Sequence, residues 1–252
     1  MKTEIYNRLE ANRGNVSLQA RSLFDKIWNA FVAMYGNENS LKFPPQIVWL
    51  NGAPGSGKGT NGRSIMKALD IFSKPVVVSD LLNSDENRDL IDSGSLIDDE
   101  KVTKVVFEKL FDGTTCRGGA IIDGFPRTLI QAECAYLFVE KAKKLPAGKD
   151  LKISVITLIV DEKSSIERQL HRGKMAKIHN ESVEENKVGE LQEIRKTDTN
   201  PQLARDRYQT FLDQTKDALD FMKDMFGAHE ISTIGSFEET KDRIYKTLRQ
   251  EK

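Results

Sequence analysis

The chain has 252 residues, of which 38 are basic and 38 acidic, so its formal net charge is zero. This balance removes the global electrostatic argument for a protein that binds nucleic acid or an anionic membrane. Two cysteines are too few for a disulfide framework, and no apolar run approaches the roughly 20 residues that a membrane span needs. Together with a polar N-terminus unlike a targeting segment, these features predict a globular cytoplasmic protein.

The first predicted element is a helix from about Ser17 to Tyr35, with two adjacent apolar stripes. Such stripes usually pack on a domain core, and the few basic residues on the polar face weaken the alternative of a membrane-surface or partner-binding helix. A polar segment that ends in Pro44-Pro45 follows. Residues 1–43 are therefore predicted to be an N-terminal helical extension, and residues 44–252 the main domain.

After Pro45, short apolar runs alternate with helical patterns. Runs that are apolar almost throughout are typical of strands buried on both faces, so we expect an α/β fold with a parallel five-stranded sheet flanked by helices. Ligands of such sheets bind beyond the carboxyl ends of the strands. The predicted strands cover residues 47–50, 76–78, 120–122, 153–160 and 230–234, and the predicted helices cover 60–72, 99–111, 128–144, 162–172, 201–226 and 237–249.

The first strand runs into a glycine-rich loop that contains the pattern G-x-x-x-x-G-K, between an apolar strand and an amphipathic helix. Glycines let several backbone N–H groups face one phosphate, and the helix N-terminus adds partial positive charge. Lys58 then reaches the outer phosphates, while Gly59 stands where the general pattern has Ser or Thr. The predicted phosphate-binding residues are Gly52, Ala53, Pro54, Gly55, Ser56, Gly57, Lys58, Gly59 and Thr60.

Several arginines lie in the part of the chain that follows the later strands. Phosphoryl transfer needs cations around the reacting phosphates, and an arginine can bind two phosphate oxygens at once. Arg168 and Arg172 are four residues apart and share a helix face, whereas His171 is expected to point elsewhere because it directly precedes Arg172. The candidate catalytic residues are Lys58, Arg127, Arg172, Arg195 and Arg207.

Asp123 ends the third apolar run, as a carboxylate that holds Mg²⁺ through water does. The alternative is a carboxylate that caps a loop amide. Mg²⁺ bound with ATP is the expected cofactor, with Asp123 and the weaker candidate Thr60 as its residues. Because residues 173–194 contain no cysteine, a Cys-based zinc site is not expected there.

Two strings, in order and both at strand ends, point to one family. Residues 52–60 resemble the phosphate loop of adenylate kinases and related nucleoside monophosphate kinases, and residues 123–128, Asp-Gly-Phe-Pro-Arg-Thr, are similar to the family's second signature. The resemblance runs from about residue 46 to residue 249 and does not cover the first forty or so. It implies ATP-dependent phosphoryl transfer to a nucleoside monophosphate.

The resemblance also implies roles for the arginines. Arg127 would hold the phosphate of the acceptor, Arg168 would pack on the base of ATP, and Arg172 would contact the ATP phosphates. The remaining two, Arg195 and Arg207, would bridge both nucleotides when a lid of residues 173–198 closes.

The acceptor is expected to be AMP, because Gln131 carries an amide that matches the adenine edge and lies one helical turn after Arg127. Residues 94–97 resemble the segment whose backbone lies against the acceptor base. The expected acceptor-binding residues are Asp80, Arg88, Leu96, Ile97, Gly124, Arg127 and Gln131.

Three features depart from the family pattern. Asn83 stands where the family has an arginine that clamps the acceptor phosphate, in an acceptor-binding segment (residues 79–97) that is shortened; Arg88 replaces that arginine if a helix begins near Ser84. The lid is long and polar, and the N-terminal helix has no counterpart in small family members. Two alternatives stay open: a kinase for another small acceptor, and a nucleotide-binding regulatory or assembly protein without transferase activity.

Overall fold

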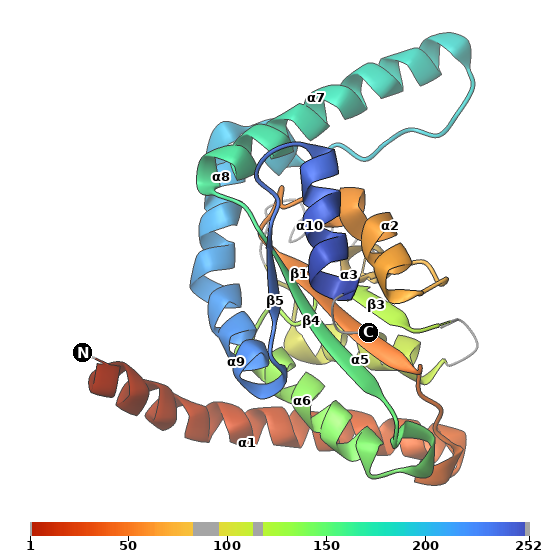
Figure 1. The fold of residues 1–252 in the computed structure, drawn as a ribbon, viewed down its shortest axis with the longest axis vertical. Helices are drawn as coiled ribbons and strands as arrows, with labels where there is room; N and C mark the ends of the chain where they lie inside the picture. The colour runs from red at the N-terminus through yellow and green to blue at the C-terminus, as the bar shows by residue number, and fades with distance from the viewer. Residues whose placement is uncertain (1, 83–95, 113–117, 250–252) are drawn as a thin grey trace.

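A computed structural model describes residues 2–82, 96–112 and 118–249, with side chains from residue 18 onward (Figure 1). Five strands form one sheet in the order β2-β3-β1-β4-β5, and every neighbouring pair is parallel. The predicted α/β fold with a five-stranded parallel sheet is therefore confirmed. The strands are β1 (Gln46–Gly52), β2 (Val76–Val77), β3 (Ala120–Asp123), β4 (Lys152–Ile159) and β5 (His229–Ser232).

Helices cover both faces of the sheet because strand side chains alternate in direction. On β1, Val48 and Leu50 pack in a core with α2 and α10, whereas Ile47 and Trp49 pack in a larger core with α5, α6 and α9. The helices that follow β1 are α2 (Lys58–Leu69), α3 (Val78–Leu81), α5 (Asp99–Phe111), α6 (Leu129–Lys143), α7 (Glu162–Asn186), α8 (Pro201–Thr210), α9 (Lys216–Phe226) and α10 (Phe237–Arg249). Short turns of 3₁₀ helix occur at Glu38–Ser40, Pro146–Gly148 and Lys196–Asp198.

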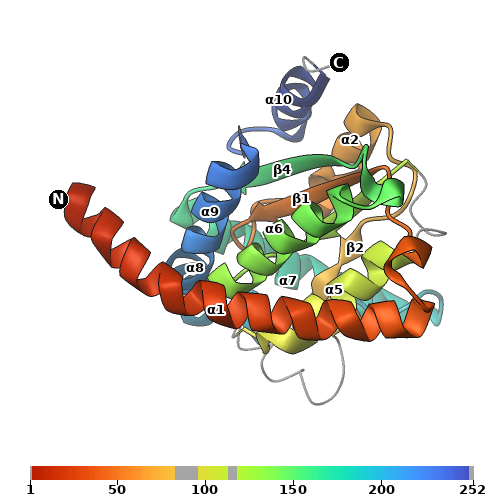
Figure 2. The same ribbon diagram turned by 90° about the horizontal axis from the view of Figure 1, so that it is seen from below.

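The first helix, α1 (Lys2–Tyr35), adds a further layer outside α6 and begins well before the predicted start (Figure 2). Its residues 20–31 share the larger core: Phe24, Trp28 and Phe31 are each less than 5% exposed. Trp28 packs on Phe111 and Phe138 and donates a hydrogen bond to Glu38, with 3.0 Å between Nε1 and Oε1. The apolar stripes of α1 therefore face the domain. Within the described residues, no helix is both long and apolar enough to cross a bilayer.

Two helix boundaries differ from the prediction. The predicted helix 162–172 continues without a break to Asn186, so α7 runs away from the sheet and the chain returns from its tip along residues 187–195 (Figure 1). The polar residues 173–194 also predict a helix, and the structure makes their first part, as far as Asn186, continuous with the helix at 162–172. The predicted helix 201–226 is interrupted by a π-helical turn at Phe211–Thr215. Such turns are rare in proteins, and those that occur are often found at functional sites.

Candidate active site

A cavity of about 580 Å³ lies at the carboxyl ends of the strands, where the topology predicts ligands. This main cavity gathers many of the predicted residues from segments far apart in the chain. Its lining residues are Pro54, Gly55, Gly57, Lys58, Gly59, Thr60, Val77, Ser79, Asp80, Asp123, Arg127, Arg168, His171, Arg172, Arg195 and Arg207.

The glycine-rich loop is held against α7, which explains part of its composition. Ser165 Oγ donates to the Pro54 carbonyl at 2.6 Å, and Arg168 Nη1 donates to the Gly55 carbonyl at 3.3 Å. Gly55 has φ of 71°, and a Cβ there would lie 2.6 Å from the Ser165 carbonyl oxygen, so only glycine permits this approach. Ala53 and Ser56 are buried and do not line the main cavity.

Lys58 begins α2 and points back into the loop. Its Nζ donates to the Gly52 carbonyl at 2.8 Å. Burial lowers the pKa of Lys58 from 10.5 to about 8; the negative charge of Asp123 opposes this shift, and the positive charge of Arg127 adds to it. A cation held at this energetic cost is poised for an anionic ligand.

Asp123 lies at the end of β3, and burial raises its pKa, while Lys58 and Arg127 act to lower it. Among the described residues, none donates a hydrogen bond to its carboxylate. Thr60 adds an exposed hydroxyl to the same cavity. One carboxylate and one hydroxyl suit Mg²⁺, which prefers oxygen donors and takes few ligands from the protein. Within the described ranges, no three His, Cys, Asp or Glu side chains gather as a richer metal site would require.

Arg127 and Gln131 are linked through the loop that follows β3. Arg127 Nε donates to the Gly124 carbonyl at 2.9 Å, and the Arg127 backbone N–H donates to Gln131 Oε1 at 2.8 Å. Gln131 Nε2 in turn donates to Asp99 at 2.9 Å. The Gln131 amide is therefore fixed by the protein and keeps one N–H and one lone pair for a ligand.

A side pocket of about 50 Å³ opens beside Gln131, and five of its lining residues carry aliphatic side chains. It contains the predicted residues Leu96 and Ile97, and a flat ring entering there would meet the fixed amide of Gln131. The lining residues are Val78, Ser79, Leu82, Leu96, Ile97, Val102, Gly124, Arg127, Gln131, Arg195 and Arg207.

The arginines near the lid are placed by contacts over long sequence distances. Arg172 makes a two-pronged ion pair with Asp198, in which Nε and Oδ2 are 2.8 Å apart. This pair requires Gly173, because a Cβ there would overlap the Asp198 carbonyl. Burial, with the positive charge of Arg195 next in effect, lowers the pKa of Arg207, which nevertheless remains protonated at neutral pH.

The returning lid segment is pinned to α7 by side chains of that helix. His179 Nε2 lies 3.0 Å from the Glu190 carbonyl oxygen, and Asn180 Nδ2 donates to the Gln192 carbonyl at 2.9 Å. The segment ends at Arg195, whose Nε donates to Glu193 at 3.1 Å. Arg195 thus reaches both the main cavity and the side pocket from a segment anchored mainly to one helix.

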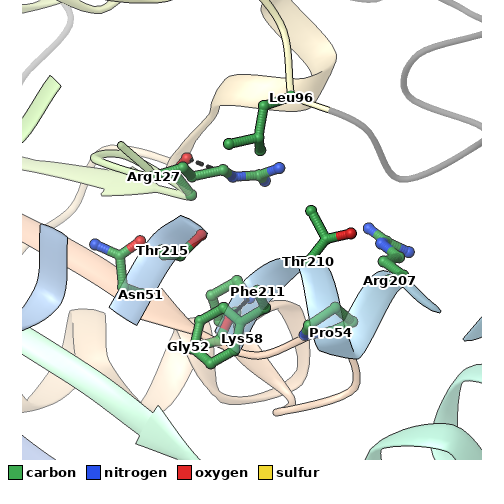
Figure 3. Close-up of a pocket in the computed structure, with 11 residues that line it drawn as sticks. Asn51, Gly52, Pro54, Lys58, Leu96, Arg127, Arg207, Thr210, Phe211 and Thr215 are labelled. Carbon is green, nitrogen blue, oxygen red and sulfur yellow. Dashed lines mark hydrogen bonds between the residues drawn. The ribbon is translucent and has the colours of Figure 1, made fainter. Parts of the chain in front are cut away.

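A third hollow of about 60 Å³, the central pocket, lies between the loop and Arg127. Figure 3 shows Arg127 and Leu96 on one side and Gly52, Pro54 and Lys58 on the opposite side. The residues that sequence reasoning missed here are Asn51, which donates to the Phe125 carbonyl at 3.0 Å, and Thr210. Two signals in the sequence could have found them. Asn51 is a polar residue at the end of an apolar strand, and Thr210 follows Arg207 by three residues, so the two share a helix face.

His171 corrects one expectation. It lines the main cavity together with Arg168 and Arg172, although it was predicted to point away from them. The reason is that residues three and four positions after Arg168 occupy one broad face of the helix. Asn83 and Arg88 lie outside the described residues, as does the predicted helix start near Ser84.

A family model described as "Adenylate kinase" matches residues 50–226, well over half of the chain. An adenylate kinase of Fusobacterium nucleatum subsp. nucleatum is 31% identical over 212 residues, which cover 79% of this chain and 96% of that protein. The adenylate kinase of Fervidobacterium nodosum is 28% identical over 214 residues, covering 78% of this chain and 94% of that protein. A solved gluconokinase from Sinorhizobium meliloti 1021 shares the fold, with TM-score 0.50 and 20% identity over 83% of this chain and 94% of that chain.

Proposed function

This chain belongs to the adenylate kinase family and is a nucleotide kinase, and we propose that it transfers the terminal phosphoryl group of ATP to AMP, forming two molecules of ADP. The observation that carries this proposal is the charge of the main cavity. Six cationic side chains and two carboxylates line it, which leaves an excess of four positive charges. One of the six cations, Arg172, is ion-paired with Asp198, which does not line the cavity. ATP with bound Mg²⁺ and AMP together bring about four negative charges.

On the donor side, the glycine-rich loop and Lys58 surround the ATP phosphates. Backbone N–H groups at the start of α2 point to the same place and add the partial positive charge of the helix end. Lys58 exchanges its bond to the Gly52 carbonyl for a phosphate oxygen. Arg168, which is fixed to the Thr233 carbonyl at 2.7 Å, then offers the face of its guanidinium to the adenine base.

On the acceptor side, Arg127 holds the phosphate of AMP, and Gln131 hydrogen-bonds the adenine edge. Asp99 and the Arg127 backbone hold the Gln131 amide in one orientation, so little rotational freedom is lost on binding. Leu96 and Ile97 pack on the flat faces of the base. The pocket therefore favours adenine over a pyrimidine, whose edge lies farther from the amide.

Transfer itself depends on placing the two nucleotides in line and stabilising the charge between them. Arg195 and Arg207 line both the main cavity and the side pocket, so they can neutralise the oxygens of the migrating phosphoryl group. The lid of residues 173–198 closes over them and excludes water, which otherwise competes as acceptor. Mg²⁺, held near Asp123 and Thr60, supplies charge neutralisation of the ATP phosphates when bound.

The deciding experiment mixes Mg²⁺ and ATP with each nucleoside monophosphate in turn and separates the diphosphate products by chromatography. We expect the highest kcat/KM for AMP. Gln131→Ala should cost about 1–3 kcal/mol of discrimination between AMP and CMP, because it leaves a polar edge unpaired. The matched control is Gln202→Ala, an exposed glutamine on α8 that bonds only within its helix.

Two results would contradict the proposal. Equal kcat/KM for AMP and CMP in the wild type would remove the role of Gln131. ATP binding without phosphorylation of any monophosphate would favour the nucleotide-binding protein without transferase activity, the reading that Asn83 at the clamp position supports.

A further inference from the structure

His171 faces the donor side of the main cavity from the middle of α7. Residues of this helix on either side of it are fixed: Arg168 to Gly55 and Thr233, and Arg172 to Asp198. The His171 side chain is exposed and lines the cavity opposite the glycine-rich loop. The stretch of helix that carries His171 is therefore held in place on both sides.

The imidazole of His171 differs from these arginines in one respect. Several N–H groups of Arg168 and Arg172 already donate to protein oxygens. Within the described residues, the His171 ring makes no hydrogen bond or ion pair. An imidazole offers one N–H when neutral and two when charged, so His171 keeps its full donor capacity for a ligand.

We propose that His171 is a further contact for the donor nucleotide, donating to an oxygen of its phosphates. This inference rests on the proposed ATP site and names a residue beyond the loop lysine and the arginines. A phosphate fits better than a base, because His171 lines the main cavity together with Arg168, Arg172 and residues of the segment 54–60, which is predicted to hold phosphates. A cationic surround concentrates anions and offers nothing specific to a base edge.

The charged groups that share the cavity would all act on a ligand near His171, so its contribution must be measured by difference. They lie at the start of α2, on α3, at the end of β3 and in the loop after it, on α7, on the lid and on α8. These groups are Lys58, Asp80, Asp123, Arg127, Arg168, Arg172, Arg195 and Arg207.

The test is equilibrium binding by calorimetry, with no turnover involved. Mg²⁺–ATP, Mg²⁺–GTP and AMP are titrated separately into the wild type and into His171→Ala, His171→Lys and Lys163→Ala. Lys163 is the matched control, because it is an exposed residue on the same helix that lies before the lid and does not line the main cavity. Thermal melts of each variant report whether the fold is retained.

We expect His171→Ala to weaken ATP binding about three- to tenfold, the range for a partly exposed charge-assisted hydrogen bond. The loss should be the same factor for GTP, since a phosphate contact ignores the base, and AMP binding should not change. His171→Lys should restore ATP affinity to within about twofold of wild type. Lys163→Ala should bind all three nucleotides as wild type does.

Three outcomes would overturn the assignment: unchanged ATP affinity in folded His171→Ala, a loss with ATP but not with GTP, or His171→Lys binding as weakly as His171→Ala. The proposed phosphoryl transfer is judged separately. A protein that shows the His171 dependence but converts no AMP would refute the transfer to AMP and leave the phosphate contact in place.

Discussion

Replacing Lys58 with methionine should make the protein inactive and, at neutral pH, more stable. The partly buried ammonium of Lys58 is held near the carbonyls of Gly52 and Ala53. Loss of one preorganised charge at the transfer point typically costs about 10²–10³ in turnover. The same change removes the cost of withdrawing a cation from water, and such an exchange of activity for stability is common.

The size of the stability gain follows from the pKa. Burial lowers the pKa of Lys58 from 10.5 to about 8, which at 1.36 kcal/mol per pH unit corresponds to at most about 3 kcal/mol. Between pH 8 and 10.5 the unfolded chain binds more protons than the folded chain, so wild-type stability rises with pH across this window. The advantage of Lys58→Met is thus largest below pH 8 and shrinks by about 1.4 kcal/mol for each pH unit above it.

The assay combines urea unfolding at pH 7, 8 and 9.5 with turnover of ATP and AMP. Lys67→Met is the matched control, because Lys67 lies on the same helix and is exposed; it should leave both turnover and the pH dependence of stability unchanged. A Lys58→Met protein that is less stable than wild type at pH 7, or whose advantage does not change with pH, would refute the electrostatic reasoning. Turnover within threefold of wild type would refute the catalytic role.

Three further predictions concern the helix layer, the lid and the acceptor segment. Trp28→Ala should lower the free energy of unfolding by about 3–5 kcal/mol, because Trp28 is 1% exposed. Met34→Ala, at a site that is 72% exposed, should change the free energy of unfolding by less than about 0.5 kcal/mol. Similar losses for both variants would mean that α1 is not part of the core. A bisubstrate dinucleotide analogue should slow hydrogen exchange in residues 173–194, and unchanged exchange at saturation would remove the lid assignment. Arg88→Ala should raise the KM for AMP roughly 10- to 150-fold and leave the KM for ATP unchanged; a parallel rise in both would show that Arg88 does not clamp the acceptor.

The positions of the strands along the chain and the site's location at their carboxyl ends could be read from local patterns. A parallel strand buried on both faces needs a continuous apolar run, and a phosphate loop needs glycines at fixed spacing before a helix. Both requirements act over a few residues, so strand β1, the loop after it and the signature at residues 123–128 were visible in the chain. Arg127, Arg168 and Arg172 were visible in the same way, by their places just beyond a strand or on one helix face, whereas the roles of Arg195 and Arg207 rest on the family resemblance.

Tertiary structure decided what lies across from each of these residues. Arg172 is paired with Asp198, 26 positions away, and the packing of α1 on α6 joins segments more than a hundred positions apart, as the Cys134 contact to the Ala20 carbonyl shows. His171 became a cavity residue only because α7 lies against the glycine-rich loop through Ser165. Periodicity tells which residues share a helix face, but the direction of that face depends on packing against distant segments. The amino-acid sequence thus indicated the fold and the phosphate loop by itself, while only the folded chain determined which N–H donors of the cavity residues are left without a protein partner.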